Sequence, residues 1–152
     1  KLLVDRTVFD NVALPLVIAG VSTKEIGKRV RAALDQVGLL GREQCVPLEL
    51  STGEQQRVGI ARAVVSKPPI LIADEPTGNL DPELSIEVMK IFRRFNEVGV
   101  TVLVASHDIY LLEHFPIRRV RLEAGRIVES SSAETTKLLD PAKLLDEREA
   151  AQ

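Results

Sequence analysis

The chain has 152 residues, of which 45% are hydrophobic and 28% charged, and its 20 basic and 22 acidic residues give a formal net charge of −2. This composition supports a globular domain with a core. It argues against a disordered chain and against a basic nucleic-acid-binding surface. No apolar run reaches the ~20 residues of a membrane span. The single cysteine excludes an internal disulfide framework. We expect a cytoplasmic protein.

Two helices are predicted in the first forty residues. Thr7 has the position of an N-cap for an amphipathic helix, which Pro15 should kink or end. Ser22 and Glu25 have the spacing of a capping box, so a second helix should begin there. Apolar residues then recur at helical spacing until Gly38, which should end this helix.

A third helix is predicted to begin at Ser51, where Ser51 and Glu54 again have the spacing of a capping box. Two prolines at 68–69 stop it. The unpaired N–H groups and the serine hydroxyl at such a helix start can bind an anion. An ordinary helix cap explains the same two residues, so both interpretations stay open at this point.

A strand–helix–strand unit follows. Residues 70–73 and 100–105 are continuous apolar runs, which are typical of parallel strands buried on both faces. The helix between them should begin at Pro82. A short helix over 109–115 and a hairpin that turns at 123–125 follow. The pattern predicts an α/β fold with a parallel sheet, next to a first part that is helical only.

Both predicted strands end in side chains that can do chemistry. The first ends in Asp74 and Glu75, and the second is followed by Ser106, His107 and Asp108. Ligands of open α/β sheets bind at the carboxyl ends of the strands. Mg²⁺ with a phosphate ligand would compensate two adjacent carboxylates. Asp74 is therefore a candidate Mg²⁺ ligand and Glu75 a candidate base for an attacking water. Two ordinary loop carboxylates are the alternative.

In combination, these runs resemble the motifs of the ATP-binding cassette (ABC) ATPases, in the family's order. Leu50–Glu54 resembles the signature motif, 70–75 the Walker B motif, 78–81 the D-loop and His107 the switch histidine. The resemblance covers about residues 1–128. It implies the C-terminal part of a P-loop NTPase domain, with a parallel sheet flanked by helices. It divides the chain into a helical subdomain over 1–60, a RecA-like α/β core over 61–128 and a polar tail over 129–152.

The resemblance also implies a head-to-tail homodimer that closes on two ATP molecules. Asp74 would hold Mg²⁺, Glu75 would act as general base and His107 would contact the γ-phosphate. In this dimer, the signature motif would face the ATP that the opposite subunit binds, through Ser51, Thr52, Gly53 and Glu54. The D-loop residue Asp81 would couple the two sites.

A narrower resemblance, carried by runs such as 6–13, 73–81 and 95–103, is to the family's bacterial cell-division ATPases. Lipoprotein-release and macrolide-efflux members share the same D-loop and are the alternative. The resemblance implies that the helical subdomain docks an integral membrane permease at the cytoplasmic face of the bacterial inner membrane. The acidic balance and the lack of coiled-coil heptads disfavour a DNA-repair member.

Two departures from the family pattern stand out. No run of the form G-x-x-x-x-G-K-[ST], whose amides cradle phosphates, occurs in the chain, and the Q-loop glutamine would fall before Lys1. We therefore expect a piece of a longer protein. By itself it should have a marginally stable or self-associating fold, and it should neither bind ATP tightly nor hydrolyse it. A natural, non-catalytic module that docks the permease or donates a half-site is the alternative. Thr52 replaces the usual glycine, which is harmless unless the backbone needs a positive φ.

Overall fold

The structure is a computed structural model that describes residues 1–131. The predicted polar tail lies outside the described residues from 132 on. The chain divides into two compact units, of which the first is Lys1–Ala105 and the second begins at Ser106. The α-helices and strands are α1 (Val8–Ile18), α2 (Thr23–Gln36), α3 (Thr52–Val64), β1 (Ile70–Asp74), α4 (Pro82–Glu97), β2 (Thr101–Ala105), α5 (Ile109–Glu113), β3 (Arg119–Glu123) and β4 (Arg126–Ser131).

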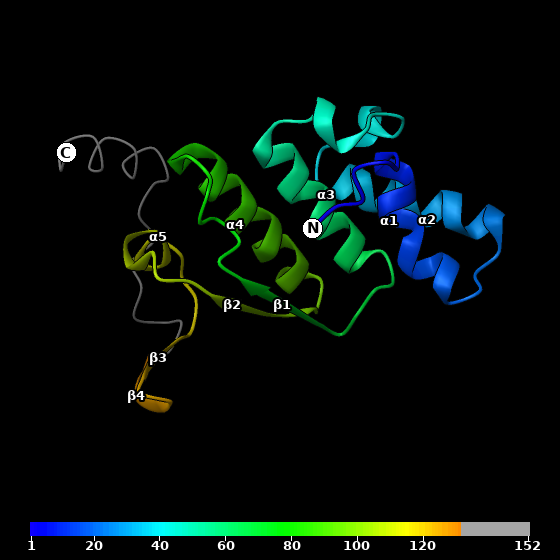
Figure 1. The fold of residues 1–152 in the computed structure, drawn as a ribbon. Helices are drawn as coiled ribbons and strands as arrows, with labels where there is room; N and C mark the ends of the chain where they lie inside the picture. Colours follow the sequence, from blue (N-terminus) through cyan, green and yellow to red (C-terminus); the bar gives the residue numbers. More distant parts are fainter. Residues whose placement is uncertain (132–152) are drawn as a thin grey trace. The chain divides into compact units, whose positions relative to one another are not determined.

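Helices α1, α2 and α3 pack against one another at the N-terminal end of the first unit (Figure 1). Each turns an apolar stripe inward, as the helical spacing of its apolar residues predicts. Two short 3-10 helices, η1 (Leu40–Arg42) and η2 (Pro47–Glu49), connect α2 to α3. The side chains that this cluster buries almost completely include Val8, Val12, Leu16, Val30, Leu34 and Val58.

The ends of these helices confirm some predicted caps and correct others. The Thr7 hydroxyl accepts a hydrogen bond from the Asp10 N–H at 3.1 Å, as predicted. Gly38, at φ +72°, directly follows Val37, the C-cap residue of α2. Pro15 does not end α1, which continues to Ile18. The predicted capping box of α2 is wrong: Ser22 makes no side-chain cap bond. The Glu25 carboxylate, which the capping box would bond to the Ser22 N–H, instead accepts from Arg29 at 2.7 Å. Arg29 lies one turn along the same helix and competes for this carboxylate.

A buried asparagine ties the N-terminal segment to α1. Asn11 has no exposed surface. Its side-chain Oδ1 accepts from the Leu3 N–H at 2.8 Å, and its Nδ2 donates to the carbonyl oxygens of Leu3, Arg6 and Thr7 at 3.0, 3.3 and 2.9 Å. These bonds satisfy the polar groups of a segment that has no regular structure of its own.

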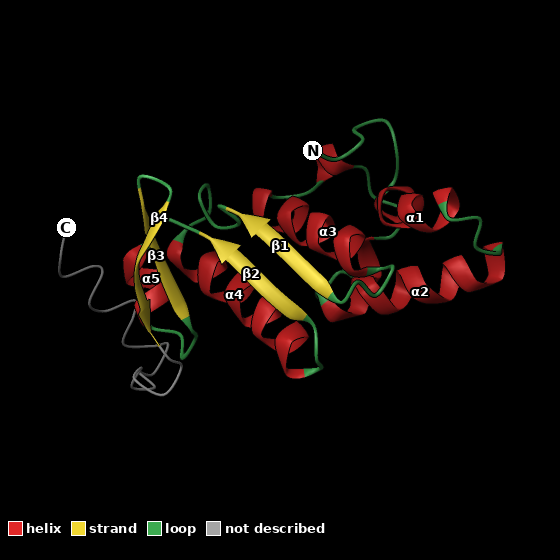
Figure 2. Cartoon of the chain, turned by 90° about the horizontal axis from the view of Figure 1, so that it is seen from below, coloured by secondary structure: helices red, strands yellow, loops and turns green. Residues whose placement is uncertain are grey.

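Strands β1 and β2 pair in parallel, with Ile70 opposite Thr101 and Asp74 opposite Ala105, and α4 forms the crossover between them. Figures 1 and 2 show both strands pointing the same way, with α3 and α4 on one face of the sheet. The opposite face of the sheet is open, so the prediction that these strands are buried on both faces is wrong. There Ile70, Ile72 and Leu103 are 56%, 71% and 60% exposed, because the described residues provide helices for one face only.

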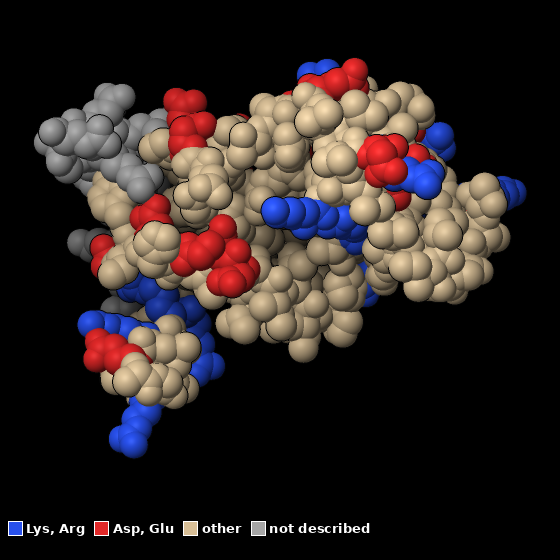
Figure 3. All heavy atoms as spheres, in the orientation of Figure 1, with Lys and Arg blue, Asp and Glu red and all other residues tan. Residues whose placement is uncertain are grey.

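The second unit contains α5 and the antiparallel β3–β4 hairpin. The hairpin turns at Ala124 and Gly125, both at positive φ, as a two-residue hairpin connection requires. Figure 3 shows basic side chains gathered over this hairpin, which carries Arg119, Arg121 and Arg126. Among the described residues, no helix is long and apolar enough to cross a membrane.

Candidate functional site

The carboxyl end of β1 presents two consecutive acidic side chains. Asp74 is the last residue of the strand and is exposed. The next residue, Glu75, is also exposed, and its backbone N–H donates to the carbonyl of Ala105 at 2.9 Å. Glu75 has φ +45°, a left-handed conformation that is uncommon for a residue with a side chain. The sheet therefore ends in a backbone turn that directs the chain away immediately after the two carboxylates.

Two tight turns lead from β1 to α4. The Gly78 N–H donates to the Glu75 carbonyl at 3.2 Å, and the Leu80 N–H donates to the Thr77 carbonyl at 3.1 Å. Asp81 then caps α4, since its Oδ1 accepts from the Leu84 N–H at 2.9 Å. The predicted D-loop residue Asp81 thus lies at a helix N-terminus, only a few residues after Glu75.

The predicted signature residues form the N-terminus of α3. The Ser51 hydroxyl accepts from the Glu54 N–H at 3.2 Å, and the Glu54 Oε2 accepts from the Ser51 N–H at 2.9 Å, so the predicted capping box is confirmed. Glu54 also pairs with Arg42, whose Nε lies 3.3 Å from Oε1. The Ser51 backbone N–H, with the nearby Arg42 charge adding to it, holds the pKa of Glu54 below its ordinary value.

The other two signature residues differ in their surroundings. Thr52 is the first residue of α3, is exposed and does not belong to the described residues with positive φ. Its β-branched side chain therefore strains no backbone. Gly53 is buried against Leu84 of α4. Because that contact joins the first turns of α3 and α4, the structure brings Ser51, Gly53 and Asp81 to the same end of the first unit. Nothing in the sequence marks Leu84 as a site residue, because its helical spacing indicates only a core position.

His107 lies in the second unit, in the segment that leads into α5. It is exposed, and its carbonyl accepts from the Ile109 N–H at 3.0 Å. Asp108 caps α5 through the Leu111 N–H at 2.9 Å, and its own N–H donates to the Ser106 hydroxyl at 3.2 Å. This bonding holds residues 106–108 in a compact turn at the start of the helix.

The donor set at the end of β1 fits Mg²⁺ that is shared with a phosphate ligand. Among residues 1–131, no group of three or more His, Cys, Asp or Glu side chains could enclose a metal by itself. Mg²⁺ typically takes one or two protein carboxylates and completes its shell with phosphate oxygens and waters. The exposed carboxylate of Asp74 is a hard oxygen ligand of this kind. The side chains present therefore suit a cation that is shared with a phosphate-containing ligand.

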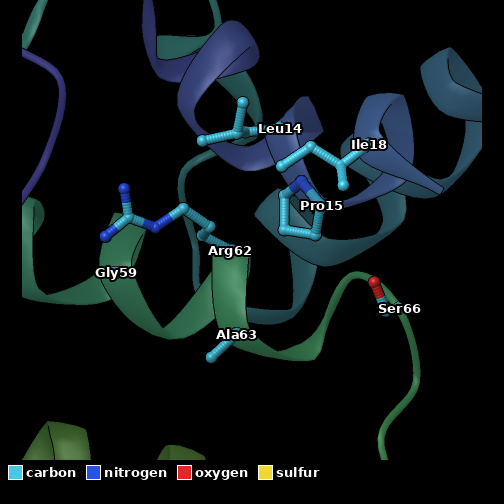
Figure 4. A pocket seen from close by; sticks show the side chains of 7 residues that line it. All are labelled: Leu14, Pro15, Ile18, Gly59, Arg62, Ala63 and Ser66. Atoms are coloured by element: carbon cyan, nitrogen blue, oxygen red, sulfur yellow. The ribbon is translucent and has the colours of Figure 1, made fainter.

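A hollow of about 630 Å³ lies between α1 and α3 (Figure 4). Leu14, Pro15 and Ile18 line it from α1, and Gly59, Arg62 and Ala63 line it from α3. The guanidinium of Arg62 also donates to the carbonyl of Lys1 at 3.0 Å. The hollow is thus a largely apolar surface with one anchored cation at its side.

Relatives identify the chain's family. The model of the family described as "ABC transporter" matches residues 1–78. The Cell division ATP-binding protein FtsE of Escherichia coli K12 is 59% identical over 126 residues, which are 83% of this chain and 57% of that protein. FtsE of Mycobacterium tuberculosis is 49% identical over 128 residues, 84% of this chain and 56% of that protein. The chain thus spans less than two thirds of the length of these relatives.

Solved structures agree with this assignment. CbiO1 of Clostridium perfringens, described as part of the ABC transporter complex cbiONQ, matches with a TM-score of 0.80 and 30% identity over 99% of this chain and 57% of that one. MJ0796, described as a bacterial ABC transporter cassette in a dimeric structure, matches with a TM-score of 0.74 and 34% identity over 88% of this chain and 59% of that one. The fold is accordingly that of a P-loop NTPase, and the chain belongs to the ABC transporter ATPase family.

Proposed function

We propose that the protein containing this chain hydrolyses ATP as the FtsE-type subunit of a membrane-associated ABC complex in bacterial cell division. The end of β1 carries this proposal: Asp74 and Glu75 leave the sheet together at its carboxyl edge, where Glu75 takes a left-handed conformation. Strained backbone of this kind is concentrated at functional sites. The 59% identity with a protein named for cell division and ATP binding supports the biological role.

In this proposal each carboxylate has its own task. Asp74 would hold the Mg²⁺ that accompanies ATP, and this cation supplies charge neutralisation at the phosphates. Glu75 would accept a proton from the attacking water. His107 would contact the γ-phosphate. Catalysis of phosphoryl transfer consists mostly of positioning and electrostatics, so the residues orient water and phosphate rather than react covalently.

The signature residues would act in a homodimer, on ATP that the opposite subunit binds. The N-terminus of α3 supplies unpaired amides and the positive end of a helix dipole, with Ser51, Thr52 and Gly53 at its start and Glu54 fixing its cap. Asp81, at the start of α4, would couple the two sites. The dimeric structure of MJ0796, a cassette that is 34% identical, supports this arrangement.

The partner in the membrane would be an FtsX-like permease at the cytoplasmic face of the inner membrane. We propose that it docks on the helical subdomain, residues 1–60. The hollow between α1 and α3 supports a docking role, because Ile18 at its border is 78% exposed and apolar. Exposed apolar surface of this kind is typical of interaction sites.

ATP hydrolysis by the protein expressed from its complete gene tests the proposal. Glu75→Gln should abolish hydrolysis while ATP still binds, because the amide cannot accept the proton of the water. Glu97→Gln changes the same kind of group at the exposed far end of α4 and should leave hydrolysis unchanged. Unmodified protein that fails to hydrolyse Mg-ATP, or Glu75→Gln that hydrolyses it normally, would contradict the proposal.

A second candidate is a non-catalytic module that docks the permease or donates its signature motif to a full-length partner. One observation favours it: Ser51 and Glu54 form a complete helix cap within this chain, and such a helix start can face an anion that another subunit binds. The intact mass of the protein in its source cells separates the candidates. A mass above that of 152 residues supports the ATPase, whereas a mass equal to it supports the module. FtsX that co-purifies with the protein distinguishes the cell-division role from that of a lipoprotein-release or efflux ATPase.

A further inference from the structure

Leu84 lies so close to Gly53 that a larger residue at position 53 would force the leucine side chain to shift. Gly53 is the second residue of α3 and is buried. A Cβ atom placed on it would lie 2.8 Å from Cδ1, 3.3 Å from Cδ2 and 3.5 Å from Cγ of Leu84. Leu84 is the third residue of α4. The first turns of the two helices therefore meet through a leucine side chain that rests on a glycine.

Leu84 is also part of the cap of its own helix. Its backbone N–H donates to the Oδ1 of Asp81 at 2.9 Å. At the facing helix start, the Glu54 N–H donates to the Ser51 hydroxyl at 3.2 Å. Leu84 thus joins two helix starts at once: its backbone is bonded to the cap of α4, and its side chain packs on the capped turn of α3.

A second contact lies one turn further along both helices. The Nη1 of Arg57 is 3.1 Å from the Oε2 of Glu87, and the Arg57 side chain is only 16% exposed. Arg57 follows Gly53 by four residues, and Glu87 follows Leu84 by three. Because both contacts advance toward the C-termini, the first turns of α3 and α4 run in the same direction with their N-termini side by side. Two contacts in succession therefore join these turns, the packing of Leu84 on Gly53 and an ion pair in which the Glu87 side chain is 58% exposed.

We propose that Leu84 is a positioning residue that sets the spacing between the signature residues at Ser51–Gly53 and the D-loop residue Asp81, so that both meet an opposing subunit together. The inference rests on the proposed function, in which both helix starts face that subunit. Leu84 touches neither nucleotide nor metal in this proposal. It acts through packing, and shifts of about 1 Å at a catalytic interface can cost about a hundredfold in rate.

The contact also gives an internal reason for a glycine at position 53, apart from any approach of phosphate. Gly53→Ala alone pushes a methyl group into Leu84. Leu84→Ala alone leaves a gap between the two turns. In the double variant, the added methyl group occupies space that the leucine has vacated, so the two changes should compensate each other rather than add.

The test compares Gly53→Ala, Leu84→Ala and the double variant in the protein expressed from its complete gene. Ile91→Val, which trims a buried residue two turns along α4, is the matched control. We expect Leu84→Ala to speed amide hydrogen exchange at positions 54 and 84, where the two cap bonds form. It should also lower kcat for ATP by about tenfold while KM changes less than about twofold. The control should lower the unfolding temperature without lowering kcat. If Leu84→Ala does not fold, Leu84→Val takes its place.

The double variant decides the inference. Exchange rates and unfolding temperature closer to the unmodified protein than those of Gly53→Ala support it. Purely additive effects would overturn it, as would a kcat loss in Leu84→Ala no greater than that of the control. Unmodified protein without ATPase activity would count against the proposed function instead, and the compensation in exchange and unfolding would still decide the packing role of Leu84.

Discussion

Asn11→Asp should destabilise the protein strongly at neutral pH and much less in acid. The substitution keeps the acceptor for the Leu3 N–H but replaces the amide nitrogen that faces three carbonyl oxygens. Burial without a donor raises the pKa of such a carboxyl far above its ordinary value. The three pH units between the ordinary aspartate pKa of about 3.9 and pH 7 correspond to about 4 kcal/mol, at about 1.36 kcal/mol per unit.

The sign of the pH dependence follows from the raised pKa. Because the folded state holds the proton more tightly than the unfolded state, stability relative to the unmodified protein is lost as pH rises above about 4. Urea unfolding of the protein expressed from its complete gene, measured at pH 4 and pH 7 by circular dichroism, gives the difference. Asn96→Asp, at an exposed asparagine whose Nδ2 donates to the Val100 carbonyl, is the control. A loss below about 1 kcal/mol at pH 7, or one that does not change with pH, would refute the assigned hydrogen bonds of Asn11.

Three further predictions concern the site and the sheet. The pKa of the Glu54 carboxylate is lowered from 4.5, so this group should stabilise the fold above that pH and lose its effect as pH falls through the lower folded pKa. In urea unfolding, the difference in stability between Glu54→Gln and the unmodified protein should therefore be full at neutral pH and shrink as pH falls below 4.5. The 152-residue chain by itself should hydrolyse no more Mg-ATP than its Glu75→Gln variant in a phosphate-release assay. The same chain should self-associate in sedimentation experiments, and Ile72→Thr with Leu103→Thr should reduce that association, since both side chains lie on the open face of the sheet.

A specific result would contradict each of these three predictions. If Glu54→Gln is as stable as the unmodified protein at every pH, the Glu54 carboxylate does not stabilise the helix cap. If the 152-residue chain hydrolyses ATP and Glu75→Gln abolishes this hydrolysis, the chain binds ATP without a P-loop. The control for the sheet is Val17→Thr, at an exposed apolar residue of α1. If it reduces association as much as the sheet variants do, the open sheet face is not the contact.

Local sequence patterns predicted most of the elements, because caps and periodicity act over a few residues. Thr7 and the Ser51–Glu54 pair cap their helices as expected, and the apolar runs form paired parallel strands. The Ser22 box failed because Arg29 competes for the same carboxylate. Sequence spacing shows which bonds are available, and it does not decide among partners that compete within one turn.

Features that depend on distant partners could not be predicted in the same way. An apolar run indicates that a strand face tends to be buried, but it does not indicate what covers that face, and the outer face of β1 and β2 is open here. The contact between Gly53 and Leu84 joins residues far apart in the chain. A glycine in a motif that resembles a phosphate site is easily assigned to the ligand, whereas its nearest neighbour in the fold is a leucine.

The left-handed backbone of Glu75 has a consequence for the trade between stability and activity. A residue with a side chain costs about 1–2 kcal/mol in this conformation, whereas glycine adopts it freely at an entropic cost of roughly 0.5–1 kcal/mol. As far as the backbone conformation is concerned, glycine at position 75 would therefore be at least as favourable as glutamate. If Glu75 has the proposed role of general base, this turn is a place where the protein gives up backbone stability for chemistry.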